Sequence, residues 1–117
     1  MPGLLGEPRP GAREIIDGLF SLARRAAKRG LQPVLGTLTP VMGRYAFLSA
    51  AGNEDIRQAV NQAILAQRDW PVADFAAALA DSADPARIAA AFDSGDGVHP
   101  GDAGASALAG AVDLSLF

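Results

Sequence analysis

Apolar residues recur at helical spacing in three segments of the chain, and polar residues fill the positions between them. Residues 12–29 hold one apolar stripe, and Gly30 follows as a C-terminal cap. In residues 53–67 the apolar positions lie four apart, and Asn53 is placed to cap the helix ahead of two acidic residues. Residues 101–116 have a third apolar side. The pattern predicts a helix in each range.

Two short, mostly apolar runs lie between these helices. Residues 32–38 are bounded by Gly30 and Pro40, and residues 70–75 contain Pro71, which is tolerated only at a strand start or on an edge. Continuous apolar runs of this length are typical of strands buried on both faces in a parallel sheet. The alternation of helix and strand predicts an α/β fold with right-handed crossovers.

Length and composition predict one folded domain. The chain has 117 residues, of which 50% are apolar and 20% are charged. Residues 1–11 hold three glycines and three prolines, so we interpret them as an irregular lead-in to a domain over 12–117. The N-terminus has no basic region followed by a long apolar run, so the sequence predicts no secretory signal and, by default, a cytoplasmic protein.

Charge and residue usage exclude several kinds of function. The net charge of -3 leaves no basic surplus to neutralise a phosphate backbone, which argues against nucleic-acid binding. Cysteine is absent and histidine occurs once, so thiolate catalysis and a multi-histidine metal site are excluded within the chain. No apolar stretch reaches the roughly 18 residues of a membrane span. We therefore expect no cofactor, no metal and no membrane-spanning segment.

The segment "FDSGDGVHPGDAG", residues 92–104, contains the single histidine, His99, three residues after Asp96. Glycines on both sides of Asp96 allow the chain to bend back so that the carboxylate reaches the ring. The alternative is a pair that only ties down a surface loop. Asp93, Asp96 and Asp102 do not have EF-hand spacing, and the glycines do not form a dinucleotide fingerprint.

The segment "DGVHP", preceded in order by "GTLTP" and "RQAVN", carries a family likeness. The chain resembles the C-terminal part of the SGNH or GDSL hydrolases, which are serine esterases and lipases with a flavodoxin-like α/β/α sandwich. The resemblance implies that His99 is a general base, that Asp96 orients it, and that the substrates are carboxylic esters. It implies no cofactor.

The family's nucleophile lies in a Gly-Asp-Ser motif, and its oxyanion donors include a glycine and an asparagine in earlier blocks. None of these blocks occurs here, and Ser94 lies only five residues before His99 in the same loop. The resemblance therefore predicts a truncated hydrolase domain that is inactive alone. Thr37 and Thr39 are candidates for lining a substrate pocket, since they lie at the end of the first predicted strand.

Two alternatives stay open. The chain is either a non-catalytic module, which forms a homodimer or complements a missing N-terminal half, or a remnant without activity of its own. In the first case an ester substrate would bind only to the complemented protein. Residues Trp70, Arg57 and Asn61 are interpreted as packing and helix-surface residues and not as ligands.

Overall fold

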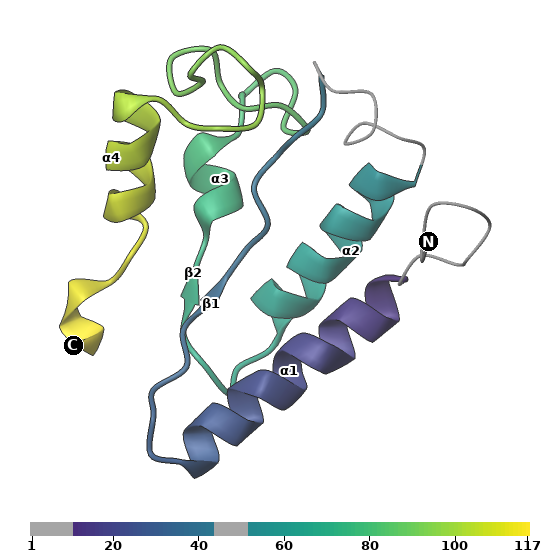
Figure 1. Ribbon diagram of the computed structural model, residues 1–117, viewed down its shortest axis with the longest axis vertical. Helices are drawn as coiled ribbons and strands as arrows, with labels where there is room; N and C mark the ends of the chain where they lie inside the picture. The colour runs from purple at the N-terminus through teal and green to yellow at the C-terminus, as the bar shows by residue number, and fades with distance from the viewer. Residues whose placement is uncertain (1–10, 44–51) are drawn as a thin grey trace.

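The computed structural model describes residues 11–43 and 52–117, and Figure 1 shows their arrangement. Helices and strands alternate along the first part of the chain, which confirms the α/β fold expected from the sequence. The elements in order are α1 (Ala12–Lys28), β1 (Leu35–Gly36), α2 (Asn53–Ala66), β2 (Val72–Ala73), α3 (Phe75–Leu79), α4 (Asp102–Gly110) and the 3-10 helix η1 (Leu114–Leu116).

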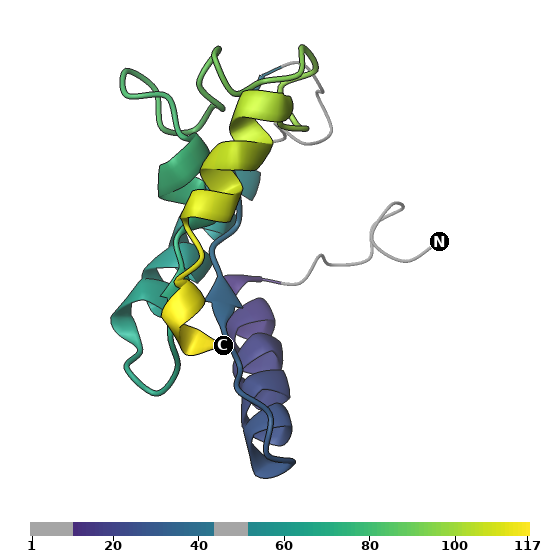
Figure 2. The same ribbon diagram turned by 90° about the vertical axis from the view of Figure 1, so that its left-hand side faces the viewer.

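Strands β1 and β2 pair in parallel, as the alternation predicts, with Leu35 opposite Val72 and Gly36 opposite Ala73. The amide of Leu35 donates to the Pro71 carbonyl at 2.9 Å. Helices α1 and α2 lie on one side of the strands and α4 on the other (Figure 1). The perpendicular view agrees, because α4 lies in front of the strands there (Figure 2). The strands thus form the middle layer.

The strands are shorter than the apolar runs that predicted them, which covered residues 32–38 and 70–75. The ladder ends after Gly36 and Ala73, although the Thr37 amide still donates to the Ala73 carbonyl at 3.2 Å. Beyond it, the Leu38 amide donates to the side chain of Asn61 at 2.8 Å. At this point the backbone is therefore hydrogen-bonded to a side chain of α2 and not to a neighbouring strand.

The second run ends early because α3 begins at Phe75. Asp74 is its N-cap, and the Asp74 carboxylate accepts a hydrogen bond from the Ala77 amide at 3.2 Å. The Phe75 ring packs closely over Gly36, where an added Cβ would lie 2.8 Å from it. The prediction that residue 75 lies in a strand is therefore wrong, because Phe75 begins α3 and its ring packs across β1.

Helix α1 ends as predicted. The backbone at Gly30 is left-handed, with φ of 80°, and its amide donates to the Ala27 carbonyl at 3.0 Å. Helix α2 differs, because its N-cap is Gly52, also left-handed with φ of 89°, and Asn53 is the first helical residue. The prediction of Asn53 as the cap is therefore off by one position.

The C-terminal helix is shorter than the predicted range of 101–116. Helix α4 stops at Gly110, and a separate 3-10 turn follows it. The Asp113 carboxylate caps this turn by accepting from the Ser115 amide at 2.9 Å. A local side-chain contact that competes with helix continuation explains the early end.

The core lies between α1, α2 and β1. Its buried members are Ala23, Leu35, Val60 and Ile64, with partly buried apolar residues of α1 around them. Two polar residues of α2, Arg57 and Asn61, are buried as well, at 9% and 8% exposure. Their burial contradicts the helix-surface part of the interpretation and agrees with the packing part. Their contacts are described below.

Candidate functional site

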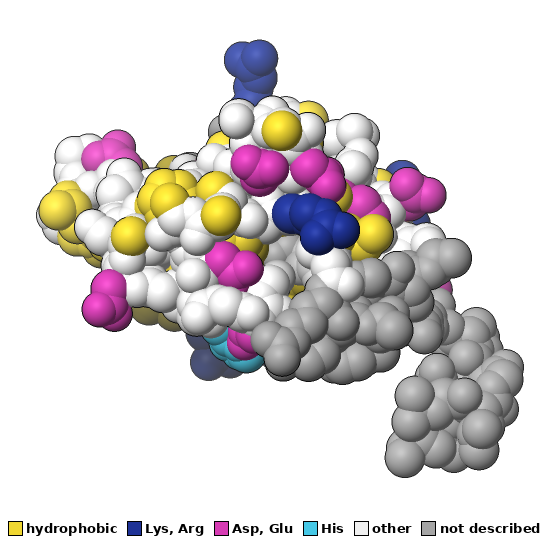
Figure 3. All heavy atoms as spheres, turned by 90° about the horizontal axis from the view of Figure 1, so that it is seen from above, with side chains coloured by type: hydrophobic (Ala, Val, Ile, Leu, Met, Phe, Trp, Pro, Cys, Tyr) yellow, Lys and Arg dark blue, Asp and Glu magenta, His cyan; other side chains and the backbone are white. Residues whose placement is uncertain are grey.

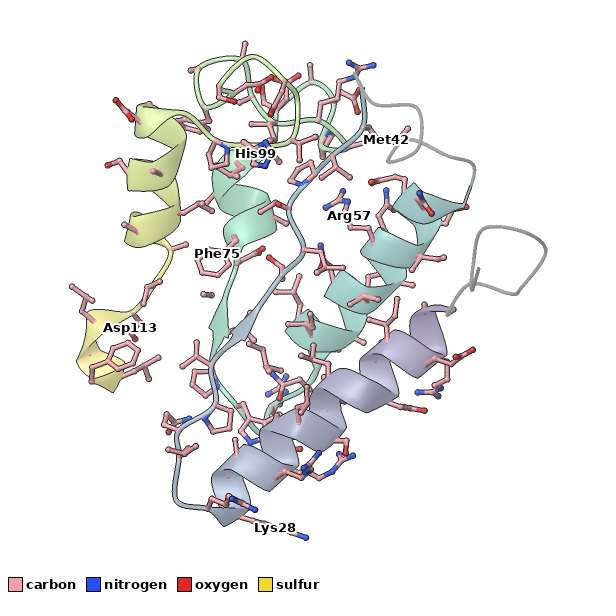
Figure 4. All side chains as sticks on the ribbon, in the orientation of Figure 1. Lys28, Met42, Arg57, Phe75, His99 and Asp113 are labelled. Carbon is pink, nitrogen blue, oxygen red and sulfur yellow. The ribbon has the colours of Figure 1, made fainter. Side chains whose placement is uncertain are left out.

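The predicted site residues lie in a loop at the carboxyl end of the sheet. Figure 4 shows His99 at the same end of the molecule as Met42, which follows β1, and far from Lys28 at the end of α1. In the end-on view, the histidine lies at the edge of this face beside an acidic side chain (Figure 3). Ligands of open α/β sheets bind at this end of the strands.

His99 and Asp96 are hydrogen-bonded to each other. The ring Nδ1 lies 2.5 Å from Asp96 Oδ2. The other oxygen, Oδ1, accepts from the backbone amides of Val98 and His99, each at 2.8 Å. These contacts lower the pKa of Asp96 well below its usual value, with the His99 amide the largest cause, followed by the ring and the Val98 amide.

The protonation of the ring follows from this geometry. An ionised carboxylate only accepts hydrogen bonds, so the neutral ring must carry its proton on Nδ1 to bond Asp96. The lone pair of the neutral ring is then on Nε2. The His99 side chain is 75% exposed, whereas that of Asp96 is only 24% exposed. The arrangement presents a basic nitrogen on an anchored ring.

Backbone contacts close the loop around this pair. The Ser94 amide donates to the His99 carbonyl at 3.0 Å, and the Gly101 amide donates to the Phe92 carbonyl at 2.8 Å. Asp93 and Pro100 form an isolated antiparallel bridge between the two arms. The loop is therefore a narrow, internally bonded turn that runs directly into α4.

No described hydroxyl group bonds the imidazole. The nearest serine in sequence, Ser94, has its Oγ 3.4 Å from Asp96 Oδ1 and contacts the carboxylate instead of the ring. Ser49 lies outside the described residues. Within the described ranges, the pair therefore has no hydroxyl to deprotonate.

The two threonines have different surroundings. Thr37 is 4% exposed, and its hydroxyl donates to Asp74 Oδ1 at 2.9 Å and accepts from the Ala76 amide at 2.8 Å. Thr39 lines a pocket of about 360 Å³ between the end of β1 and the start of α2, together with Leu38, Val41, Asn53, Glu54, Ile56 and Arg57. Substrate binding by either residue stays a prediction, and Thr39 has the side chain beside an open space.

Sequence reasoning missed two side chains of α2 that bind the segment following β1. Arg57 Nη1 donates to the Leu38 carbonyl at 3.0 Å, and Asn61 Nδ2 donates to the same oxygen at 2.9 Å. Arg57 is also held by Glu54, at 2.7 Å from Nε and 2.6 Å from Nη2. Residues 57 and 61 lie on the same stripe as Val60 and Ile64, so polar positions within an apolar stripe were the available signal.

The loop at His99 also borders a smaller polar pocket of about 170 Å³. Asp93, Asp96 and Arg87 line it together with Met42 of the segment after β1. Among the described residues, no three histidine or acidic side chains are grouped so that they could hold a metal ion. Within the same ranges, none of the helices has the length and apolar character needed to cross a membrane.

We expect the lowered pKa of Asp96 to make the protein less stable in acid. The folded state binds the Asp96 proton less readily than the unfolded state, so this contribution is complete above the ordinary pKa of about 3.9 and is lost as the pH falls below it. Urea unfolding between pH 5 and pH 3 tests this. The free energy of unfolding should fall more steeply for the wild type than for Asp96→Asn, and parallel curves would contradict the expectation.

Comparison with known families agrees with the likeness seen in the sequence. The family profile described as GDSL-like Lipase/Acylhydrolase matches residues 8–112, which is most of the chain. A comparison of the chain with curated proteins found no match.

Proposed function

Because the chain belongs to the GDSL-like lipase/acylhydrolase family, we propose that it carries the base half of a carboxylic-ester hydrolase site. In this proposal His99 is the general base and Asp96 orients it. The observation that supports it is the ring held through Nδ1 by an ionised carboxylate, while Nε2 of the exposed ring has no hydrogen-bond partner among residues 11–43 and 52–117. The complete site would also need a serine nucleophile and oxyanion donors.

The chemistry assigned to the pair is proton transfer. Nε2 takes the proton from an attacking hydroxyl as its oxygen bonds to the ester carbonyl carbon, and then gives that proton to the departing alkoxide. Water hydrolyses the acyl-enzyme in a second round of the same transfers. Asp96 stays ionised throughout and stabilises the imidazolium.

We further propose that the chain alone does not turn over esters. A positioned base contributes only about 10²–10⁴-fold. The nucleophile and the oxyanion donors, whose removal one donor at a time costs about 10²–10³-fold, are not recognisable in the sequence. The domain over 12–117 would then be the C-terminal part of a hydrolase.

The test is hydrolysis of p-nitrophenyl acetate by the purified chain at pH 8. We expect the rate to match that of free imidazole at the same concentration and His99→Ala to remove only that background. Asp96→Asn is compared with it and should retain a background reaction, because the exposed imidazole itself remains. Saturable turnover that both substitutions abolish would overturn inactivity and would require a nucleophile within the chain.

A second candidate is a non-catalytic interaction module. It is favoured by the sheet, which in the described residues has two strands and therefore leaves the outer edges of both without a strand neighbour. Such a module would form a homodimer or bind a separate N-terminal half. Light scattering over a concentration series distinguishes these cases: a monodisperse monomer argues against the homodimer, and a dimer supports it.

A further inference from the structure

We propose that Asp93 is a positioning residue that holds the Asp96–His99 pair in its hydrogen-bonded geometry. Its place in catalysis rests on the proposed function, but its effect on the pair is independent of any activity. The Asp93 carboxylate accepts hydrogen bonds from backbone amides, and none from the ring among the described residues. It acts on the backbone that carries Asp96 and His99.

The Asp93 carboxylate accepts two hydrogen bonds from the turn. Its Oδ1 accepts from the Gly95 amide at 2.9 Å and from the Gly97 amide at 3.0 Å. Both glycines have positive φ, 125° and 77°. Residues with side chains rarely adopt these conformations, so the turn around Asp96 depends on glycine and on an acceptor that holds both amides.

Asp96 lies between the two amides that Asp93 holds. The next two amides along the chain, those of Val98 and His99, are the ones that Asp96 Oδ1 accepts. The direction of those amides depends on the backbone at Gly97, which Asp93 fixes. The two aspartates therefore form consecutive acceptor sites along one turn, and the second one bonds the histidine ring.

The base of the turn is also held by backbone hydrogen bonds that do not need the Asp93 side chain. The Asp93 amide donates to the Ala89 carbonyl at 3.1 Å, and Gly101 donates to Phe92 at 2.8 Å. Loss of the Asp93 side chain should therefore loosen the tip of the loop while α4 stays in place. The loss is local, so the folded protein remains available for measurement.

Loss of the Asp93 charge and loss of its hydrogen bonds would shift the titration midpoint of Asp96 in opposite directions. The sign of the shift therefore shows which of the two effects dominates. Removing a negative charge near Asp96 stabilises the Asp96 carboxylate and moves its titration midpoint down. Losing the turn weakens the amide bonds to Asp96 and moves the midpoint up toward the ordinary value of about 3.9. Asp93→Ala changes both, whereas Asp93→Asn removes the charge and keeps an oxygen acceptor.

The experiment is NMR of the full chain. The Asp96 carboxyl is followed by its ¹³C shift, the His99 tautomer by ¹⁵N shifts, and the loop amides by hydrogen exchange. In Asp93→Ala we expect the Asp96 midpoint to rise, the Nδ1–H tautomer to lose population, and the Val98 and His99 amides to exchange about tenfold faster. Asp93→Asn should keep the tautomer and the exchange rates of the wild type and should not raise the midpoint, since it removes the charge and keeps the acceptor. Asp102→Ala, which removes an exposed acid on α4, should change none of the three.

The outcomes separate the two proposals. If Asp93→Ala leaves the Asp96 midpoint and the His99 tautomer as in the wild type, the positioning role is overturned and the proposed function stands. A midpoint that moves down in both Asp93 variants also overturns it, because that result reports charge alone. If the wild type itself shows no coupling between Asp96 and His99, the proposed base half fails.

Discussion

Arg57→Met will destabilise the protein by about 3 kcal/mol, because breaking a buried ion pair leaves its partner charged and unpaired. The Arg57 and Glu54 side chains are only 11% and 16% exposed. The substitution also removes a donor to the Leu38 carbonyl and a longer contact, at 3.5 Å, to the Pro85 carbonyl. Urea unfolding at pH 7 measures the change.

The matched control is Arg13→Met, which removes the exposed Arg13–Asp17 pair on α1, whose side chains are 81% and 67% exposed. An exposed pair contributes about 0–1 kcal/mol, so little change is expected. The double variant Arg57→Met with Glu54→Leu should recover part of the loss, because it leaves no unpaired charge. Equal effects of Arg57→Met and Arg13→Met would show that the buried pair does not hold α2 against β1.

Gly104→Ala will cost about 2 kcal/mol, although alanine is the better helix former. A Cβ at position 104 would lie 2.4 Å from the Phe92 carbonyl oxygen and 2.6 Å from the Pro100 Cβ. Neither atom is the end of a flexible side chain, so α4 must move away from the loop. Overpacking lowers the free energy of unfolding by about 1–3 kcal/mol, whereas replacing glycine by alanine in a helix raises it by roughly 1 kcal/mol. Because the close contact is with backbone, we expect the overpacking cost to exceed that gain.

Gly110→Ala is the internal control, because it makes the same change at the last residue of α4 with no atom within 4 Å. It should be neutral or slightly stabilising. The two variants are compared by thermal and urea unfolding, and by the His99 ring shifts, since Pro100 directly follows His99. If both variants gained stability, α4 would not be packed against the loop as described.

The sequence predicted α1 and α2 to within about one residue because their apolar stripes are long. It overestimated the length of the strands, because an apolar run does not show where the backbone stops pairing with another strand. At Leu38 that change depends on Asn61, which is 23 positions away in the chain. Helix α3 went unpredicted because Phe75–Leu79 is a single alanine-rich turn with no periodicity to read.

The Asp96–His99 pair could be found in the sequence because it is local: two residues three positions apart and the two glycines flanking Asp96 define it. Arg57 was misread as a surface residue because an arginine is buried only when its partners are in place. Those partners include the Leu38 and Pro85 carbonyls, distant in sequence. The sequence raised Asp93 only as one of three acidic residues without EF-hand spacing, since a short motif does not reveal which amides a carboxylate accepts.

The brevity of the β1–β2 ladder, with its two register positions, has a consequence for how the molecule comes apart. Beyond the ladder, the joint between the segment after β1 and the second half of the chain is made by hydrogen bonds of single residues. The Thr37 hydroxyl donates to Asp74 and accepts from the Ala76 amide, and the Met42 amide donates to the Ala86 carbonyl. We expect heating to separate the histidine-bearing half at this joint first, while α1 and α2 stay packed together.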